Sequence, residues 1–146
     1  MIRLTFSVRP DQGEASDFDL GDMVCEGESG TAGSAGHVPD QGMMIYLSVP
    51  LLLDALRPLV AGERKNASFA GTDSSFRLDF RRGRKGIVTV SANGTVVGTC
   101  GPDELVEAVL RPAEALEREL LSRLPAESGA ARDLASSLER FRAAAA

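Results

Sequence analysis

The only histidine, His37, is the first candidate for acid–base or nucleophilic chemistry. It lies in a Gly- and Ser-rich stretch near Ser34 and Asp40, and the chain's two thiols are Cys25 and Cys100. Nucleophilic catalysis requires a nucleophile held against an oriented base, which a histidine on a flexible loop does not provide. The sequence has no GxSxG motif, and the thiols lack the close spacing of zinc ligands. We therefore predict a solvated histidine, two buried free thiols, and no catalytic, cofactor or metal site.

The acidic segment 17–28 superficially resembles a calcium-binding loop. Asp17, Asp19 and Glu28 occupy the first, third and twelfth positions of such a loop. However, Gly21 and Asp22 stand fifth and sixth, whereas the EF-hand requires Gly at the sixth position for its sharp turn. No amphipathic helix flanks the segment on either side. We interpret it as an acidic strand edge and loop without calcium.

Charge is distributed unevenly along the chain, which has a formal net charge of -5. Residues 11–40 include eight acids and no Lys or Arg, whereas 81–85 carries four cations. An acidic protein repels phosphate, so general binding to nucleic acid or to an anionic membrane is not expected. Charged surfaces accelerate association with complementary partners. We therefore predict that partner binding uses the acidic segment 11–40 and weakens as salt rises, with the basic tip 81–85 as the next candidate. The candidate partner-binding residues are Asp17, Asp19, Asp22, Glu26, Glu28, Arg82, Arg84 and Lys85.

The first half of the chain predicts strands followed by a helix. Apolar residues alternate over 2–8, which indicates a strand with one buried face, and 18–25 suggests a second strand. The Gly-, Ser- and acid-rich stretch 26–42 predicts a long loop. The continuous apolar run 43–48 predicts a buried central strand, and apolar spacing with an early proline predicts a helix over 50–61.

The second half predicts a three-stranded meander over 75–100, followed by helices over 103–124 and 131–142. Asn93-Gly94 favours a type I′ hairpin turn, because both positions tolerate positive φ. A loop of five residues at 82–86 keeps the apolar side chains on one face. The expected pairs are Ala92 with Thr95, Val90 with Val97, Val88 with Thr99, Phe80 with Val88, and Leu78 with Val90.

These elements and the length of 146 residues predict a single α+β domain over 1–146. The fold expected is a largely antiparallel sheet of about five to six strands, covered on one face by the three helices. The N-terminus lacks the pattern of a signal peptide, and the longest apolar run is too short to span a membrane. We therefore expect a cytoplasmic protein, and the preference for Arg over Lys suggests a bacterial gene of high GC content.

The leading functional hypothesis is a non-enzymatic protein-binding module, such as an immunity protein, a regulator or an accessory subunit. The alternative is a small enzyme or small-molecule binder with a pocket between sheet and helices. Two or more titratable groups in a deep pocket would favour that alternative. A third hypothesis is contact with nucleic acid through the basic hairpin 81–85. The sequence leaves the oligomeric state open.

Overall fold

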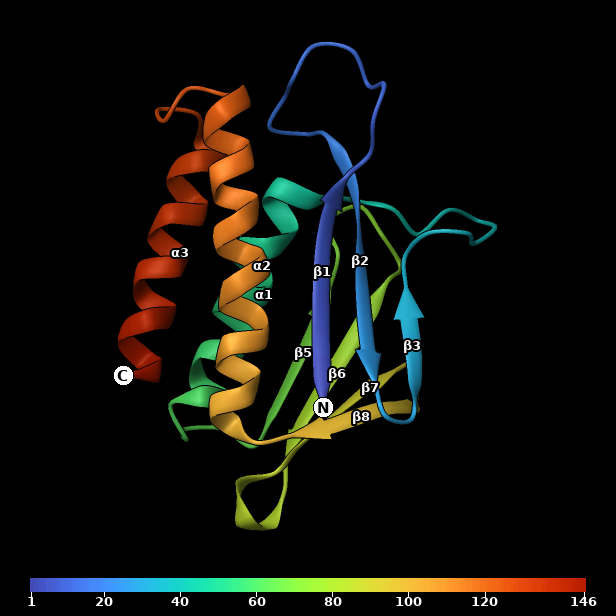
Figure 1. Cartoon of the computed structure of the whole chain (residues 1–146), viewed down its shortest axis with the longest axis vertical. Coiled ribbons are helices and arrows are strands. Elements are labelled where there is room, and N and C mark those ends of the chain that lie inside the picture. The colour runs from blue at the N-terminus through green and yellow to red at the C-terminus, as the bar shows by residue number, and fades with distance from the viewer.

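The computed structural model describes all residues 1–146 and contains two antiparallel sheets of four strands each, together with three α-helices (Figure 1). The first sheet contains β1 (Ile2–Val8), β2 (Leu20–Gly27), β3 (Gly30–Gly33) and β4 (Met43–Met44). The second contains β5 (Asn66–Ala70), β6 (Arg77–Arg82), β7 (Val88–Ala92) and β8 (Thr95–Cys100), in that order. The predicted α+β fold is confirmed, with the strands divided between two sheets.

The helices lie together on one side of the molecule, beside the two sheets (Figure 1). They are α1 (Ile45–Val60), α2 (Pro102–Arg123) and α3 (Gly129–Ala145). Helix α1 packs on β5, α2 packs on β1, and α3 packs on the other two helices. The predicted helices 103–124 and 131–142 therefore correspond to α2 and α3. Pro58 and Pro112 lie inside α1 and α2 without ending them.

The prediction of a central strand over 43–48 is wrong. Only Met43–Met44 is extended, and α1 begins at Ile45, five residues before the predicted helix start. A short continuous apolar run does not distinguish a buried strand from a buried helix. Ser48 fits the helix because its hydroxyl donates to the Met44 carbonyl at 2.8 Å. The same hydroxyl accepts from the Thr72 N–H at 2.9 Å, so a polar side chain is satisfied inside the core.

Two strands lie where the sequence pattern predicts none. The predicted loop 26–42 includes the end of β2 and all of β3, which pair as a hairpin with Gly27 opposite Gly30. Strand β5 precedes the predicted meander and extends the second sheet. Its pattern is weak because Phe69 is the only one of its five side chains that is fully buried.

The meander of the second sheet is confirmed, but its register differs from the predicted one. Asn93 and Gly94 have φ of 50° and 79°, as a type I′ turn requires, and Ala92 lies opposite Thr95. A bulge next to Ser91 then places Val90 opposite Gly98, rather than opposite Val97. On the other side Phe80 lies opposite Val90 and Arg82 opposite Val88. The loop between β6 and β7 is therefore 83–87 rather than 82–86. The register between these two strands differs from the predicted one by two residues. Because side chains alternate with a period of two, the same side chains still face the core.

The two sheets approach each other closely where β2 ends and β8 passes. A Cβ on Gly27 would collide with the Val97 carbonyl, and one on Gly98 would lie 3.0 Å from the Gly27 Cα. The Ser29 N–H donates to the Val97 carbonyl at 2.9 Å across this junction. Glycine is needed here because two backbones meet without room for side chains.

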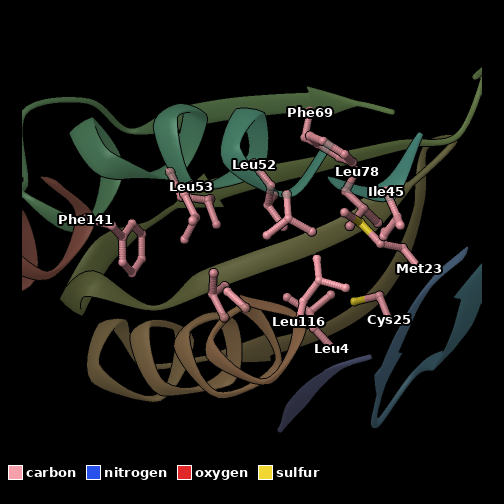
Figure 2. Close-up of a cluster of buried hydrophobic side chains, with 14 of the residues drawn as sticks. Leu4, Met23, Cys25, Ile45, Leu52, Leu53, Phe69, Leu78, Leu116 and Phe141 are labelled. Atoms are coloured by element: carbon pink, nitrogen blue, oxygen red, sulfur yellow. The ribbon is translucent and has the colours of Figure 1, made fainter. Parts of the chain in front are cut away.

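A single apolar cluster joins both sheets and all three helices, and it contains 30 buried residues. Figure 2 shows side chains from the sheets, such as Leu4 and Leu78, directed toward Leu52 of α1 and Leu116 of α2. None of the residues of the basic tip 81–85 belongs to this core.

Candidate partner-binding surface

The structure does not assemble the residues that would be needed for nucleophilic catalysis. His37 is exposed, and its Nε2 lies 2.7 Å from a backbone carbonyl oxygen four residues earlier. Ser34 is buried, and its hydroxyl donates to the Asp22 carboxylate at 2.7 Å. Cys25 and Cys100 are buried and free, and burial raises the pKa of their thiols to about 12 and about 11. Thiols protonated in this way are poor nucleophiles.

The acids of the segment 17–28 do not form a calcium loop. Residues 20–27 are extended as β2, so Asp17 and Glu28 lie at opposite ends of an eight-residue strand. At about 3.3 Å per residue, those ends are on the order of 25 Å apart. No group of three or more His, Cys, Asp or Glu side chains is placed to hold a metal ion.

Arg9 engages two of the acids at the end of the first sheet. Its Nε lies 2.9 Å from one carboxylate oxygen of Asp22, and one of its terminal nitrogens lies 2.9 Å from the other. Its two terminal nitrogens lie 2.7 and 2.9 Å from the Asp40 carboxylate. Hydrogen bonds from the guanidinium lower the pKa of both carboxyls. The negative charge of Asp22 is therefore compensated within the fold rather than offered to a partner.

Two further candidate acids are also engaged. The Asp19 side chain is only 5% exposed, and its carboxylate lies 3.7 Å from Arg123 of α2. Glu28 accepts a hydrogen bond from the Met1 ammonium at 2.8 Å and another from the Thr99 N–H at 2.6 Å. The hydrogen bond from the ammonium is the main reason that the pKa of Glu28 is lowered to about 2.

The candidate acids therefore do not form one surface. Asp17, Asp19 and Asp22 lie toward the start of β2, whereas Glu26 and Glu28 lie at its other end. Asp17 and Glu26 have no cation within ion-pair distance, and both are half-buried. Of the five candidate acids, only these two carry a charge that no cation of the fold compensates.

The basic candidates gather with additional cations that the sequence reasoning missed. The Arg82 N–H donates to the Lys65 carbonyl at 2.7 Å, which places the chain before β5 beside the end of β6. A hollow of about 330 Å³ lies there, and neither an acidic nor a hydrophobic side chain lines it. Together with neighbouring cations it forms what we term the basic surface, which comprises Arg64, Lys65, Arg81, Arg82, Arg84 and Lys85.

One member of the basic surface has a structural role. A terminal nitrogen of Arg82 donates to the Leu59 carbonyl at 3.0 Å, near the end of α1. A cation at the C-terminal end of a helix also interacts favourably with the helix dipole. Arg82 thereby ties the end of β6 to α1, while Arg81, Arg84 and Lys85 are exposed.

The cations of the basic surface form no ion pairs. The chain has 16 Lys and Arg residues, and six arginines pair with acids within the fold. Six of the ten remaining cations belong to the basic surface, so positive charge that is free to attract a ligand is concentrated there. The loop 9–19 projects at the opposite end of the molecule (Figure 1).

Comparisons with protein-family models, curated proteins and solved structures yield no match to this chain. None of the three helices combines the length and the apolar composition required for crossing a membrane.

Proposed function

We propose that the protein is a non-enzymatic binding module that contacts an acidic region of another protein through the basic surface. The observation that carries this proposal is the concentration of six unpaired cations at one end of a protein whose net charge is -5. Such an arrangement steers an acidic partner toward one end of the molecule. An immunity protein, a regulator or an accessory subunit in the bacterial cytoplasm would use a surface of this kind.

An acidic protein suits this surface better than nucleic acid does. The outward face of the second sheet continues from Asn66 and Arg81 to Ser68, Thr89 and Ser91, and a hollow of about 300 Å³ lies over it. Asp79 also lies on this face, and its charge is compensated by Arg77 at 3.1 Å. Single-stranded nucleic acid is bound largely by stacking of bases on aromatic side chains, and this outward face presents none. Its hydroxyl and amide groups instead suit hydrogen bonds with a polar protein segment.

A small-molecule binder is the second candidate, favoured by a hollow of about 640 Å³ between β1 and α2. Its carboxylates are already engaged, which leaves little for acid–base chemistry. Glu104 accepts from the Ile2 N–H at 3.2 Å, and Glu107 lies 2.8 Å from Arg111. The hollow is open to solvent, whereas ligand sites bury most of their ligand.

The proposal is tested by affinity capture from a lysate of the source cells. The bait is compared with a variant carrying Arg81→Glu, Arg84→Glu and Lys85→Glu, which spares the structural Arg82. We expect the wild-type bait to retain an acidic protein that the variant loses. We also expect the association rate between the wild-type protein and this partner to fall by about tenfold or more when salt is raised from low to high.

The matched control reverses Arg3, Arg118 and Arg132, which are exposed, form no ion pair and lie outside the basic surface. It changes the net charge equally and should capture the partner like wild type. Equal loss in both variants would contradict the proposal, as would retention in both. Loss of the partner only with Asp17→Lys and Glu26→Lys would assign binding to the acidic residues, and recovery of nucleic acid would favour that ligand.

A further inference from the structure

Strand β5 is hydrogen-bonded on one side only. It pairs with β6 along Asn66–Ala70, and no other strand pairs with it. Two backbone hydrogen bonds that flank β5 show which of its residues direct their N–H and C=O groups toward β6. The Arg82 N–H donates to the Lys65 carbonyl at 2.7 Å, and the Gly71 N–H donates to the Phe76 carbonyl at 3.0 Å. The odd-numbered residues of β5 therefore bond to β6.

The even-numbered residues present their main-chain groups on the other side. In an antiparallel ladder, the N–H and C=O of alternate residues point away from the neighbouring strand. Asn66, Ser68 and Ala70 therefore direct these groups outward, and all three residues are exposed. None of the backbone hydrogen bonds made outside the regular elements involves them. Three donors and three acceptors are consequently free along this edge.

The outer edges of β8 and β1 are covered. The outer edge of β8 receives the Ser29 N–H on the Val97 carbonyl and the Met1 ammonium on the Thr99 carbonyl. The edge of β1 lies beside α2, and the Ile2 N–H donates to a glutamate of that helix. Natural sheets usually protect exposed edges with charge, proline or a bulge. Strand β5 has none of these between Asn66 and Ala70.

Charge indicates what kind of strand this edge would accept. Arg64 and Lys65 directly precede β5, and Arg81 lies opposite Asn66 on β6. These cations belong to the basic surface and form no ion pair. A segment lying beside β5 would therefore place one of its ends next to unpaired positive charge, which favours acidic side chains at that end.

We infer that β5 accepts an extended acidic segment of a partner protein as an additional antiparallel strand. The inference rests on the proposed function, because it specifies how an acidic partner would sit on the basic surface. Main-chain hydrogen bonds to Asn66, Ser68 and Ala70 supply binding, as in other cases of strand addition. Acidic side chains at the C-terminal end of the segment lie beside Arg64 and Lys65 and set its direction.

The probe is an acetylated peptide of about eight residues, with alternating Val and Thr followed by three Glu, which is long enough to span β5 and reach Lys65. A second peptide of the same sequence carries N-methyl groups at alternate Val and Thr residues. The methyl groups remove donors that strand addition needs, while all the charge remains. The readout is hydrogen exchange of the individual backbone amides, followed by NMR.

In the free protein, the amides of Asn66, Ser68 and Ala70 should exchange rapidly, whereas those of Ala67 and Phe69 are protected by β6. The unmodified peptide should slow exchange at the three outward amides by about tenfold or more. The N-methylated peptide should not. Failure of the unmodified peptide to protect these amides overturns the inference.

A proline on the edge provides an independent test. Ser68→Pro removes an outward N–H and leaves the ladder with β6 intact, since edge strands tolerate proline on the open side. Ser68→Ala is the matched control, because it loses the hydroxyl bond to Asp79 at 2.7 Å but keeps the N–H. We expect Ser68→Pro to weaken peptide binding about tenfold and Ser68→Ala to bind like wild type. Ala70→Pro repeats the test at a second outward position if Ser68→Pro melts at a lower temperature.

The outcomes separate this inference from the proposed function. Equal binding of both peptides would overturn strand addition and leave the charge contact standing. Absence of any partner in the capture experiment would contradict the proposed function, whatever the peptides do. Protection of the three amides in free protein that rises with protein concentration would show that a second copy of the chain occupies the edge, which also overturns the inference.

Discussion

Replacing Arg9 by methionine is expected to destabilise the protein by about 2 kcal/mol. This equals the contribution of one hydrogen bond to a charged group, about 1.5–3 kcal/mol, because solvent partly screens the pair of bonds that Arg9 makes. Arg9 follows β1 and holds Asp22 of β2, whose side chain is only 14% exposed, through two hydrogen bonds of 2.9 Å. After the substitution, the Ser34 hydroxyl still donates to Asp22, which limits the loss. Asp40 is exposed, so we assign no contribution to the free energy of unfolding to its ion pair with Arg9.

The effect should depend on pH in a defined direction. Arg9 lowers the pKa of Asp22 in the folded state below its value in the unfolded chain. Stability from this pair is therefore fully present above the unfolded pKa of about 3.9 and is lost as pH falls through the folded pKa. Urea unfolding followed by circular dichroism at neutral pH and near pH 3 should show a difference between wild type and Arg9→Met that shrinks in acid.

A double-mutant cycle with Asp22→Asn isolates the interaction. The coupling free energy between the two positions should be at least about 1 kcal/mol at neutral pH. Asp40→Asn serves as the comparison and should lower the melting temperature less, because that carboxylate is exposed. A coupling near zero, or a difference that is the same at every pH, would refute the assigned role of Arg9.

Three further predictions follow from burial and from the placement of acids. Val90 is fully buried opposite Phe80, so Val90→Asp should cost several kcal/mol, comparable to total stability, and a melting temperature close to wild type would show that the face is misassigned. Burial raises the pKa of Cys25 and Cys100, so neither thiol should react with an aromatic disulfide reagent until urea unfolds the chain, and a linked peptide in unreduced protein would contradict this. Millimolar calcium should leave the melting temperature unchanged, because the acids of 17–28 are spread along a strand, and a clear rise would contradict that placement.

The elements predicted from sequence are those whose pattern is local. Alternation over Ile2–Val8 predicts β1 because that strand buries one face, and Asn93-Gly94 predicts its turn through backbone conformation alone. The beginning of α1 is not predictable in this way, since the continuous apolar run from Met43 to Leu47 suits a buried strand and a buried helix equally. Strand β5 escapes prediction because it is an edge strand with one buried side chain and therefore has little periodicity.

The candidate site was predictable only in part. The tip 81–85 is a continuous run of cations, so its charge is visible in the sequence. The pairing that brings Lys65 beside Arg82 depends on β5, and the compensation of Asp22 by Arg9 joins residues 13 positions apart. Which charges remain free is a property of tertiary structure, and a count of charges along the chain does not reveal it.

Val97 is the extra residue that the bulge inserts in β8. Its position determines where the second sheet would tolerate an insertion or a deletion. Because of the bulge next to Ser91, Val97 directs its side chain into the core and its carbonyl toward the Ser29 N–H of the first sheet. A one-residue deletion there would straighten the hairpin and remove both the apolar side chain and the link between sheets. The tip 83–87 lies beyond the core and has no such constraint. Related chains should therefore vary in length at 83–87 and keep a constant spacing from Ala92 to Gly98.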